Sequence, residues 1–176
     1  MNIRQAAVDD AVAIAHIHIE SWRTTYPGMV PQEYLDNLSI ARRAAHLIGL
    51  LSEEASDTIH LLAEADSGEP VGFGSFGPNR DEPVEYSSEI YALYVLREHH
   101  GTGIGRALFL ESVRLLIDRG CDSMMLWVLR DNPACGFYEH LGGILVGEKT
   151  ITLGGAPVKG VCYGWRDLSR FLKSLF

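Results

Sequence analysis

A glycine-rich loop between a buried strand and a helix constrains this chain more than any other feature. Residues 89–96, E-I-Y-A-L-Y-V-L, are rich in β-branched and aromatic residues and alternate poorly, as is typical of a strand buried on both faces. Gly101, Gly103 and Gly105 follow, and a helical pattern runs over residues 104–119. Such a loop points backbone N–H groups and the positive end of a helix at bound phosphate. We interpret it as a pyrophosphate-binding loop.

Two familiar nucleotide-binding loops are excluded by the residues that follow these glycines. A Walker loop needs Lys-Ser or Lys-Thr after its last glycine, whereas this loop continues with Arg106 and Ala107. The dinucleotide pattern G-x-G-x-x-G also fails, because its third glycine falls on Arg106 or on Leu108, depending on where counting starts. A helix start that needs close packing remains an alternative explanation of the glycines.

The remaining pattern, an apolar strand followed by H-G-T-G-I-G-R-A-L, closely resembles the acetyl-coenzyme A loop of the GCN5-related N-acetyltransferases (GNAT superfamily). The family pattern Arg/Gln-x-x-Gly-x-Gly/Ala falls on His100, Gly103 and Gly105. His100 departs from the pattern, since the family usually has Arg or Gln there. Because the loop works mainly through backbone N–H groups, we expect weaker side-chain help at this position and not loss of binding.

The order of predicted elements favours an α/β fold in a single domain, residues 1–176, a length that allows a full core. We expect a mixed central sheet of about six to seven strands with helices on both faces. The strand–helix–strand unit around the loop predicts a right-handed parallel crossover, and the hairpins are antiparallel. The resemblance, which covers nearly the whole chain, implies the same element order and a parallel strand pair that splays apart. The expected strands are 3–6, 60–64, 71–76, 89–96, 124–129, 144–151 and 159–165, and the expected helices start near 10, 31, 40, 104 and 135.

Charge and composition bound the partners and the compartment. A formal charge of −8 argues against nucleic-acid binding and is compatible with a cationic acceptor. No apolar run approaches the ~20 residues that cross a membrane, and residues 1–10 lack a signal-peptide core. The three cysteines are odd in number and form no C-x-x-C, which favours a reducing cytoplasm. We therefore expect a cytoplasmic protein that binds neither nucleic acid nor membrane, with a homodimer as one possible assembly.

The resemblance implies a set of residues that bind acetyl-CoA (coenzyme A). The pyrophosphate is expected on the backbone N–H groups of residues 101–106, and the pantetheine arm beside the strand. Asn132, in D-N-P-A-C-G-F-Y, stands where the family commonly has an Asn bonded to that arm, although Asn before Pro is also ordinary turn chemistry. Arg106 adds charge beside the phosphates or is simply a solvated arginine. The cofactor-binding residues are Leu93, Tyr94, Val95, His100, Gly101, Thr102, Gly103, Ile104, Gly105, Arg106 and Asn132.

Two side chains are candidate catalytic groups. Tyr138 matches the family's N-x-x-(A/G)-x-x-(F/Y)-Y pattern, and a phenol with an ordinary pKa of ~10 suits protonation of the leaving thiolate. Glu89 is the candidate base, because it is expected to share a strand side with Tyr91 and Leu93, and a carboxylate there is costly unless used or paired. The alternatives are a solvated strand-end glutamate, a pair with a nearby arginine, or proton removal through water.

The acceptor pocket and the overall function rest on fewer signals. Aromatic side chains suit amines, so Trp22, Tyr26, Phe76 and Tyr91 are candidates for its lining, each with a core position as the alternative. No metal site is expected, since His16 and His18 diverge on a helix. The expected function is an acetyl-CoA-dependent N-acetyltransferase that acts on a primary amine of a small molecule or peptide by direct attack in a ternary complex. The alternative is a non-catalytic acetyl-CoA sensor or regulatory module.

Overall fold

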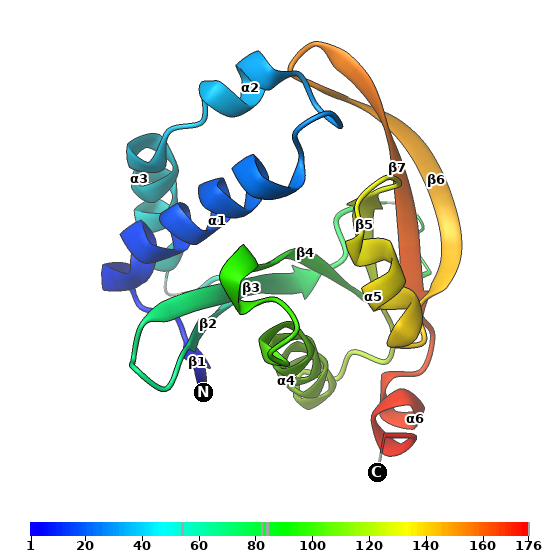
Figure 1. The fold of residues 1–176 in the computed structure, drawn as a ribbon. Coiled ribbons are helices and arrows are strands. Elements are labelled where there is room, and N and C mark those ends of the chain that lie inside the picture. The colour runs from blue at the N-terminus through cyan, green and yellow to red at the C-terminus, as the bar shows by residue number, and fades with distance from the viewer. Residues whose placement is uncertain (54, 82, 84, 176) are drawn as a thin grey trace.

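The chain folds around one mixed β-sheet (Figure 1). The computed structural model describes residues 1–53, 55–81, 83 and 85–175. Within these residues the sheet has seven strands in the order β1-β2-β3-β4-β5-β7-β6. Neighbouring strands are antiparallel except β4 and β5, which are parallel. The strands are β1 (Asn2–Gln5), β2 (Ile59–Glu64), β3 (Pro70–Pro78), β4 (Ser88–Val95), β5 (Met124–Leu129), β6 (Ile144–Leu153) and β7 (Ala156–Trp165).

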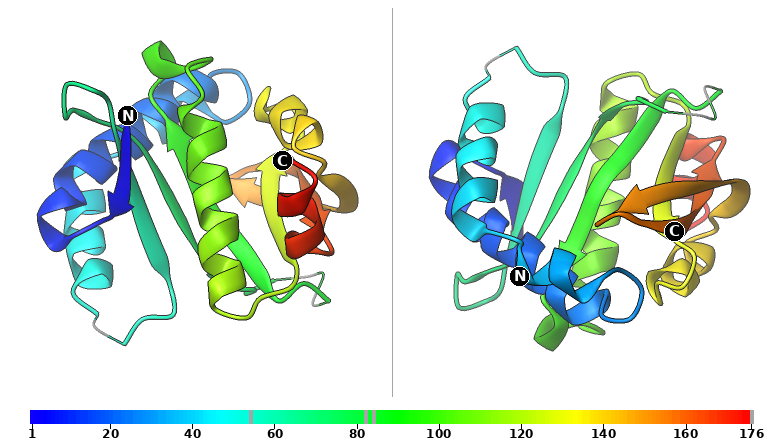
Figure 2. Two further views of the ribbon diagram at one scale, coloured as in Figure 1. Left: turned by 90° about the horizontal axis from the view of Figure 1, so that it is seen from below. Right: turned by 90° about the horizontal axis from the view of Figure 1, so that it is seen from above.

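Helices pack on both faces of this sheet (Figure 2). The helices are α1 (Ala11–Thr25), α2 (Gln32–Asp36), α3 (Ile40–Leu51), α4 (Ile104–Asp118), α5 (Ala134–His140) and α6 (Leu168–Lys173). On one face, Ile14 of α1 and Leu47 of α3 pack against Phe73 of β3. On the other, Leu108 of α4 packs in a larger core with Leu61 of β2. The apolar stripes of the two helix groups thus bury both sides of the central strands.

Strands β4 and β5 separate soon after they begin. They pair only over residues 88–90 of β4 and 124–126 of β5. No pair joins them beyond Ile90 within the described residues, although β4 stays paired to β3 as far as Val95 and β5 stays paired to β7 as far as Leu129. The facing edges of the two strands are therefore unpaired over their C-terminal halves. The expected splay of the parallel pair is confirmed.

A β-bulge interrupts β4 at Tyr91. Ser75 of β3 pairs with Ala92, and the next residue, Phe76, pairs with Ile90. Tyr91 is the extra residue of the bulge and has no partner on β3. Bulges of this kind bend a strand and are common beside functional sites.

The bulge changes which side chains share a face of β4. Ile90 and Leu93 both contact the core beneath α4, whereas Tyr94 contacts the core beneath α1. With strict alternation Ile90 and Leu93 would lie on opposite faces. Glu89, next to Ile90, therefore lies on the face opposite to Leu93. This corrects the prediction that Glu89 and Leu93 share a side, which assumed unbroken alternation.

The predicted fold class and element order are confirmed, with one helix missed. Helix α6 follows the last strand and is capped by the Asp167 side chain, which accepts a hydrogen bond from the N–H of Arg170 at 2.8 Å. Its six residues carry too short a pattern to predict. Across the described part of the chain, none of the helices has the length and apolar character needed to cross a bilayer.

Candidate functional site

The loop between β4 and α4 presents a row of unused backbone donors. The N–H groups of residues 101–106 make no hydrogen bond to any acceptor in the described part of the chain. Gly101 and Gly103 have φ of +77° and +89°, and a Cβ added to either would meet nothing within 4 Å. Ile104 begins α4, so the free N–H groups coincide with the positive end of that helix. This geometry fits an anionic group such as a pyrophosphate.

His100 holds the loop against β4. Its Nε2 lies 2.9 Å from the carbonyl oxygen of Val95, and because a carbonyl only accepts, Nε2 is the donor. The Thr102 hydroxyl donates to the carbonyl of His99 at 2.7 Å and closes the turn further. The side chain that stands in place of the family's Arg or Gln therefore fixes the loop's shape.

Two exposed arginines flank this loop. Arg106 on the first turn of α4 and Arg97 in the 3₁₀ turn Arg97–His99 make no ion pair with a carboxylate of the described residues. Sequence reasoning singled out Arg106 and missed Arg97. The chemistry of a phosphate site favours both, since unpaired cations beside free N–H groups add to the field on an anion.

The unpaired edge of β4 provides a second set of main-chain groups. Leu93, Tyr94 and Val95 pair with β3 on one side and have no strand partner on the side that faces β5. An extended ligand with amide groups of its own could bond to this edge as an added strand does. The edge begins at the end of β4 that leads directly into the loop. Both parts thus fit one ligand that carries a pyrophosphate and an amide-bearing arm.

A hydrogen-bonded row of side chains closes the other side of the splay. Trp22 Nε1 donates to the Tyr94 hydroxyl at 3.0 Å, and Asn132 Nδ2 donates to the Tyr26 hydroxyl at 3.2 Å. The two phenols pack in one cluster. Burial raises the pKa of Tyr26 and of Tyr94, so both hydroxyls stay protonated near neutral pH. The row links α1, β4 and the turn after β5.

Asn132 also shapes the start of α5. Its Oδ1 accepts a hydrogen bond from the N–H of Ala134 at 2.9 Å, and its side chain is 9% exposed. The amide thus combines ordinary turn chemistry with the bond to Tyr26. The Nδ2 group carries two N–H donors, and only the one to Tyr26 is used within the described residues.

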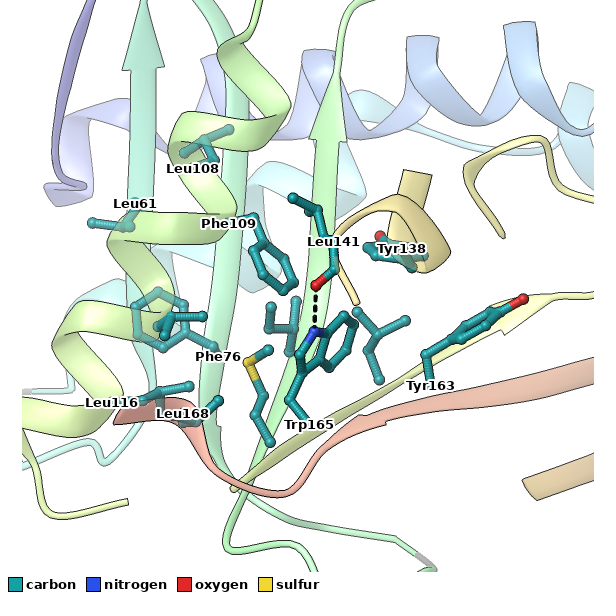
Figure 3. Close-up of a cluster of buried hydrophobic side chains, with 14 of the residues drawn as sticks. Leu61, Phe76, Leu108, Phe109, Leu116, Tyr138, Leu141, Tyr163, Trp165 and Leu168 are labelled. Atoms are coloured by element: carbon teal, nitrogen blue, oxygen red, sulfur yellow. Dashed lines mark hydrogen bonds between the residues drawn. The ribbon is translucent and has the colours of Figure 1, made fainter. Parts of the chain in front are cut away.

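Helix α5 places Tyr138 in the core beside the splay (Figure 3). Trp165 Nε1 donates to the carbonyl of Leu141 at 2.8 Å and holds the C-terminal end of the helix. Gly143 permits this close approach, because a Cβ there would lie 2.7 Å from Trp165 and 2.9 Å from the Tyr138 carbonyl. The orientation of Tyr138 is therefore fixed by packing around α5.

The acidity of Tyr138 differs from the sequence-based expectation. The side chain is 6% exposed, and its hydroxyl makes no hydrogen bond within the described residues. Burial raises its pKa well above the usual value for a phenol, with a smaller contribution from Tyr26. The prediction of an unshifted pKa is wrong, because it neglected desolvation of the phenolate. The Tyr138 phenol is therefore protonated near neutral pH.

Glu89 is buried and paired. Its carboxylate, in a side chain 7% exposed, accepts from Arg80 Nη2 at 3.1 Å, from Arg80 Nε at 3.2 Å and from the Arg80 backbone N–H at 3.1 Å. The arginine side chain is 58% exposed. Pairing with an arginine was one of the alternatives for this residue, and Arg80 is the partner that sequence reasoning did not name. The charge of Arg80 offsets the free-energy cost of burying the Glu89 carboxylate.

The four candidate lining residues of the acceptor pocket fall into separate places. Trp22 and Tyr26 lie together, with ring centroids 4.7 Å apart. Phe76 is fully buried in the core beneath α4, so the structure does not bring it to them. Tyr91 lies at the bulge, where its hydroxyl donates to the Pro78 carbonyl at 2.6 Å and the Arg80 guanidinium stacks 3.4 Å above its ring. No local signal in the sequence distinguishes these environments, since each depends on contacts between distant segments.

Known proteins that are similar to this chain are acetyltransferases. Residues 13–143 match a family model described as "Acetyltransferase (GNAT) family". The chain is 35% identical to the uncharacterized N-acetyltransferase YuaI of Bacillus subtilis, with 99% of this chain and 98% of that protein covered. It is 25% identical to spermidine N(1)-acetyltransferase of Thermoplasma acidophilum, over 83% and 89%. The solved structure of the PaiA N-acetyltransferase of Thermoplasma acidophilum in complex with coenzyme A superimposes with a TM-score of 0.68 at 24% identity, over 91% and 96%.

Proposed function

The chain belongs to the acetyltransferase (GNAT) family and is an acetyl-CoA-dependent N-acetyltransferase, and from this premise we propose that it acetylates a primary amine of a small molecule or peptide. The amine attacks the thioester directly within a ternary complex. The observation that carries this proposal is the row of free N–H groups at residues 101–106, continuous with the unpaired edge of β4. Together they suit a donor held from its phosphates to its thioester.

Donor binding rests on main-chain groups. The N–H groups of residues 101–106 and the charges of Arg97 and Arg106 hold the pyrophosphate. The free edge of Leu93 to Val95 bonds to the pantetheine arm, and Asn132 Nδ2 offers one further donor. An N–H of Leu93 or Tyr94 then polarises the thioester carbonyl, as an oxyanion-hole donor does.

Proton transfer is assigned to two side chains. Glu89, directly or through water, takes the proton that the amine loses as the C–N bond forms. Tyr138 gives its phenol proton to the sulfur as the C–S bond breaks, and the released thiol leaves neutral. The raised pKa keeps the Tyr138 phenol protonated at neutral pH, which opposes a role as base. The ion pair with Arg80 holds the Glu89 side chain in a fixed position.

The raised pKa of the Cys135 thiol favours direct attack by the amine over an acyl-enzyme intermediate. Burial raises the pKa of this thiol, and its Sγ lies 3.5 Å from the carbonyl oxygens of Leu129 and Arg130. A thiol with a raised pKa is a poor nucleophile at neutral pH.

The cysteine chemistry also supports a cytoplasmic location, since Cys121, Cys135 and Cys162 are all free thiols.

The acceptor is expected to approach past Trp22 and Tyr26. Their rings, which meet edge to face, lie in the core on the side away from α4, where an amine can reach a thioester held on β4. Aromatic faces attract cationic or amphipathic amines. The relative named as a spermidine acetyltransferase makes polyamines the first class to test. The sensor alternative is set aside, because family membership makes the chain an enzyme.

The deciding experiment measures thiol release from acetyl-CoA over a panel of amines. The panel contains polyamines, amino acids, aminoglycosides and peptides with a free N-terminus, and each acceptor is checked for the mass gain of one acetyl group. We expect turnover with at least one amine and none when the acceptor lacks a primary amino group. Exclusive acetylation of hydroxyl or thiol acceptors would contradict the proposal.

A further inference from the structure

A pocket of about 480 Å³ is lined by residues of α1, α2 and α3 and of the segment between α2 and α3, outside the donor site. Its volume is in the range of pockets that hold small ligands. Basic and aromatic side chains dominate its lining, and none of its lining residues is acidic. The basic and aromatic residues of the lining are His18, Trp22, Tyr34, Arg42, Arg43 and His46.

Arg43 brings an unpaired charge to this pocket. Its Nε is buried without a hydrogen-bond partner, and no carboxylate of the described residues forms an ion pair with its guanidinium. Burial lowers its pKa, which reflects the cost of holding the charge away from water. By contrast, Arg4, Arg23, Arg80 and Arg114 all pair with carboxylates. A half-buried arginine without a counter-ion calls for an explanation.

His18 adds a second unsatisfied group at the same place. Its Nδ1 is buried without a partner, and its ring stacks on Tyr94 with centroids 5.0 Å apart. Burial, and to a lesser extent the charge of Arg43, lowers its pKa to about 3. The Arg43 guanidinium is a donor with no acceptor for its Nε among the described residues, and His18 Nδ1 is a second buried nitrogen without a partner there, which indicates that a hydrogen-bonding group is missing from this pocket.

We propose that the pocket between α1, α2 and α3 binds a small oxyanion, a carboxylate or a phosphate group, which pairs with the Arg43 guanidinium. The planar fork of an arginine fits both groups with two parallel hydrogen bonds. Arg42 and His46 at the rim add to the positive field, and Trp22 and Tyr34 offer apolar surface to the rest of the ligand. Trp22 also donates to Tyr94 on β4, so the pocket shares a wall with the donor site.

Thermal unfolding tests this site in the full chain. Wild type, Arg43→Met and Arg170→Met are compared at constant ionic strength in chloride, inorganic phosphate or succinate. Saturating coenzyme A is present throughout, so that phosphate cannot act at the donor loop. Arg170 is the matched control, because it is exposed on α6 and forms no ion pair within the described residues.

The expected result has two parts. In chloride, Arg43→Met unfolds at the same temperature as wild type or higher, because the change removes an uncompensated charge and no hydrogen bond. Phosphate, succinate or both raise the Tm of wild type and of Arg170→Met with the logarithm of their concentration, and the affinity falls at least about tenfold in Arg43→Met. A response to phosphate alone identifies a phosphate ligand, and a response to succinate alone a carboxylate.

Two results overturn the proposal. One is an equal Tm rise, or none, in wild type and Arg43→Met with both anions. The other is a large loss of stability in Arg43→Met, including failure to fold, since that assigns the guanidinium to the structure of the chain itself. Because the test reads anion binding and not turnover, it is independent of the proposed acetyl transfer.

Discussion

Asn132 Nδ2 donates a hydrogen bond to the Tyr26 hydroxyl at 3.2 Å, although the two residues are 106 positions apart. Tyr26 ends α1, and Asn132 precedes α5, so the bond joins the two segments that flank the open end of the β4–β5 splay. Tyr94 of β4 packs in the same cluster as Tyr26. The Tyr26 phenol therefore joins the turn after β5 to the segment expected to meet the acceptor.

Removal of that hydroxyl should be costly. In Tyr26→Phe, the buried Asn132 amide loses the acceptor of its Nδ2 group, so we expect the free energy of unfolding to fall by about 1–3 kcal/mol. Tyr34→Phe is the control, since the Tyr34 hydroxyl makes no hydrogen bond within the described residues. Urea denaturation measures both variants. Equal, negligible effects would show that the row contributes nothing to stability.

Two glycine substitutions distinguish the effect of the loop on coenzyme A binding from its effect on the stability of α4. Gly103 and Gly120 stand at opposite ends of the helix with φ of +89° and +83°, and a Cβ on either meets nothing within 4 Å. Gly103→Ala and Gly120→Ala should therefore each destabilise by about 1–2 kcal/mol. Only Gly103→Ala should weaken coenzyme A binding in calorimetry, because it disturbs the free N–H groups. Matching losses of affinity would place the phosphates elsewhere.

Tyr138→Phe should slow turnover while leaving donor affinity little changed. Loss of the proton donor to the leaving sulfur is expected to lower kcat about 10²–10⁴-fold. Tyr163→Phe is the control, since Tyr163 belongs to the same core but its hydroxyl donates a hydrogen bond to Glu139 at 2.6 Å. Steady-state kinetics at saturating substrates, with coenzyme A binding measured in parallel, distinguish the roles. Unchanged kcat in Tyr138→Phe removes the residue from the mechanism.

The base assignment requires a control for the ion pair. Glu89→Gln removes the carboxylate and also breaks its pair with Arg80, whereas Arg80→Met breaks the pair and keeps the carboxylate. If Glu89 takes the amine proton, kcat/KM should fall about 10²–10⁴-fold in Glu89→Gln and much less in Arg80→Met. Equal losses in both variants would mean that the pair acts through the structure of β4.

Buried histidine makes stability depend on pH. The pKa of His18 is lowered by burial from 6.5 to about 3, so below pH 6.5 the unfolded chain binds a proton that the folded chain does not. The free energy of unfolding should therefore fall as pH falls from about 6.5 to about 3, by up to about 1.4 kcal/mol per pH unit from this residue. His60, whose pKa burial also lowers, acts in the same direction.

Substitution isolates the contribution of His18. In His18→Gln, denaturation between pH 4 and 7 should give a shallower slope than wild type, and His16→Gln, at an exposed position of the same helix, should keep the wild-type slope. A slope that does not change in His18→Gln would show that other groups control acid stability.

The sequence predicted what is encoded locally. The residues of β4 and the loop through Gly105 carry their structure in a short window, so the strand, the turn and the start of α4 followed from composition and spacing. The splay of β4 from β5 came from the resemblance to a family. The free backbone N–H groups of the loop were predictable because positive φ and a helix start both depend on nearby residues.

What the sequence missed depends on distant contacts. The bulge at Tyr91 arises from pairing with β3, and it reversed the side on which Glu89 was expected. Arg80 comes from a loop, and nothing in that segment marks it as the partner of Glu89. The pKa of Tyr138 depends on burial by several elements, which an isolated motif does not report. Such properties require the assembled core.

The short pairing of β4 with β5 has an evolutionary consequence. Main-chain groups are the same whatever side chain is attached, so point substitutions along the open edge leave its donors and acceptors in place. The surfaces around Trp22 and Arg43 are built from side chains, and there a single replacement alters what can bind. A protein of this design can exchange one amine for another over generations while its grip on the acyl donor stays intact.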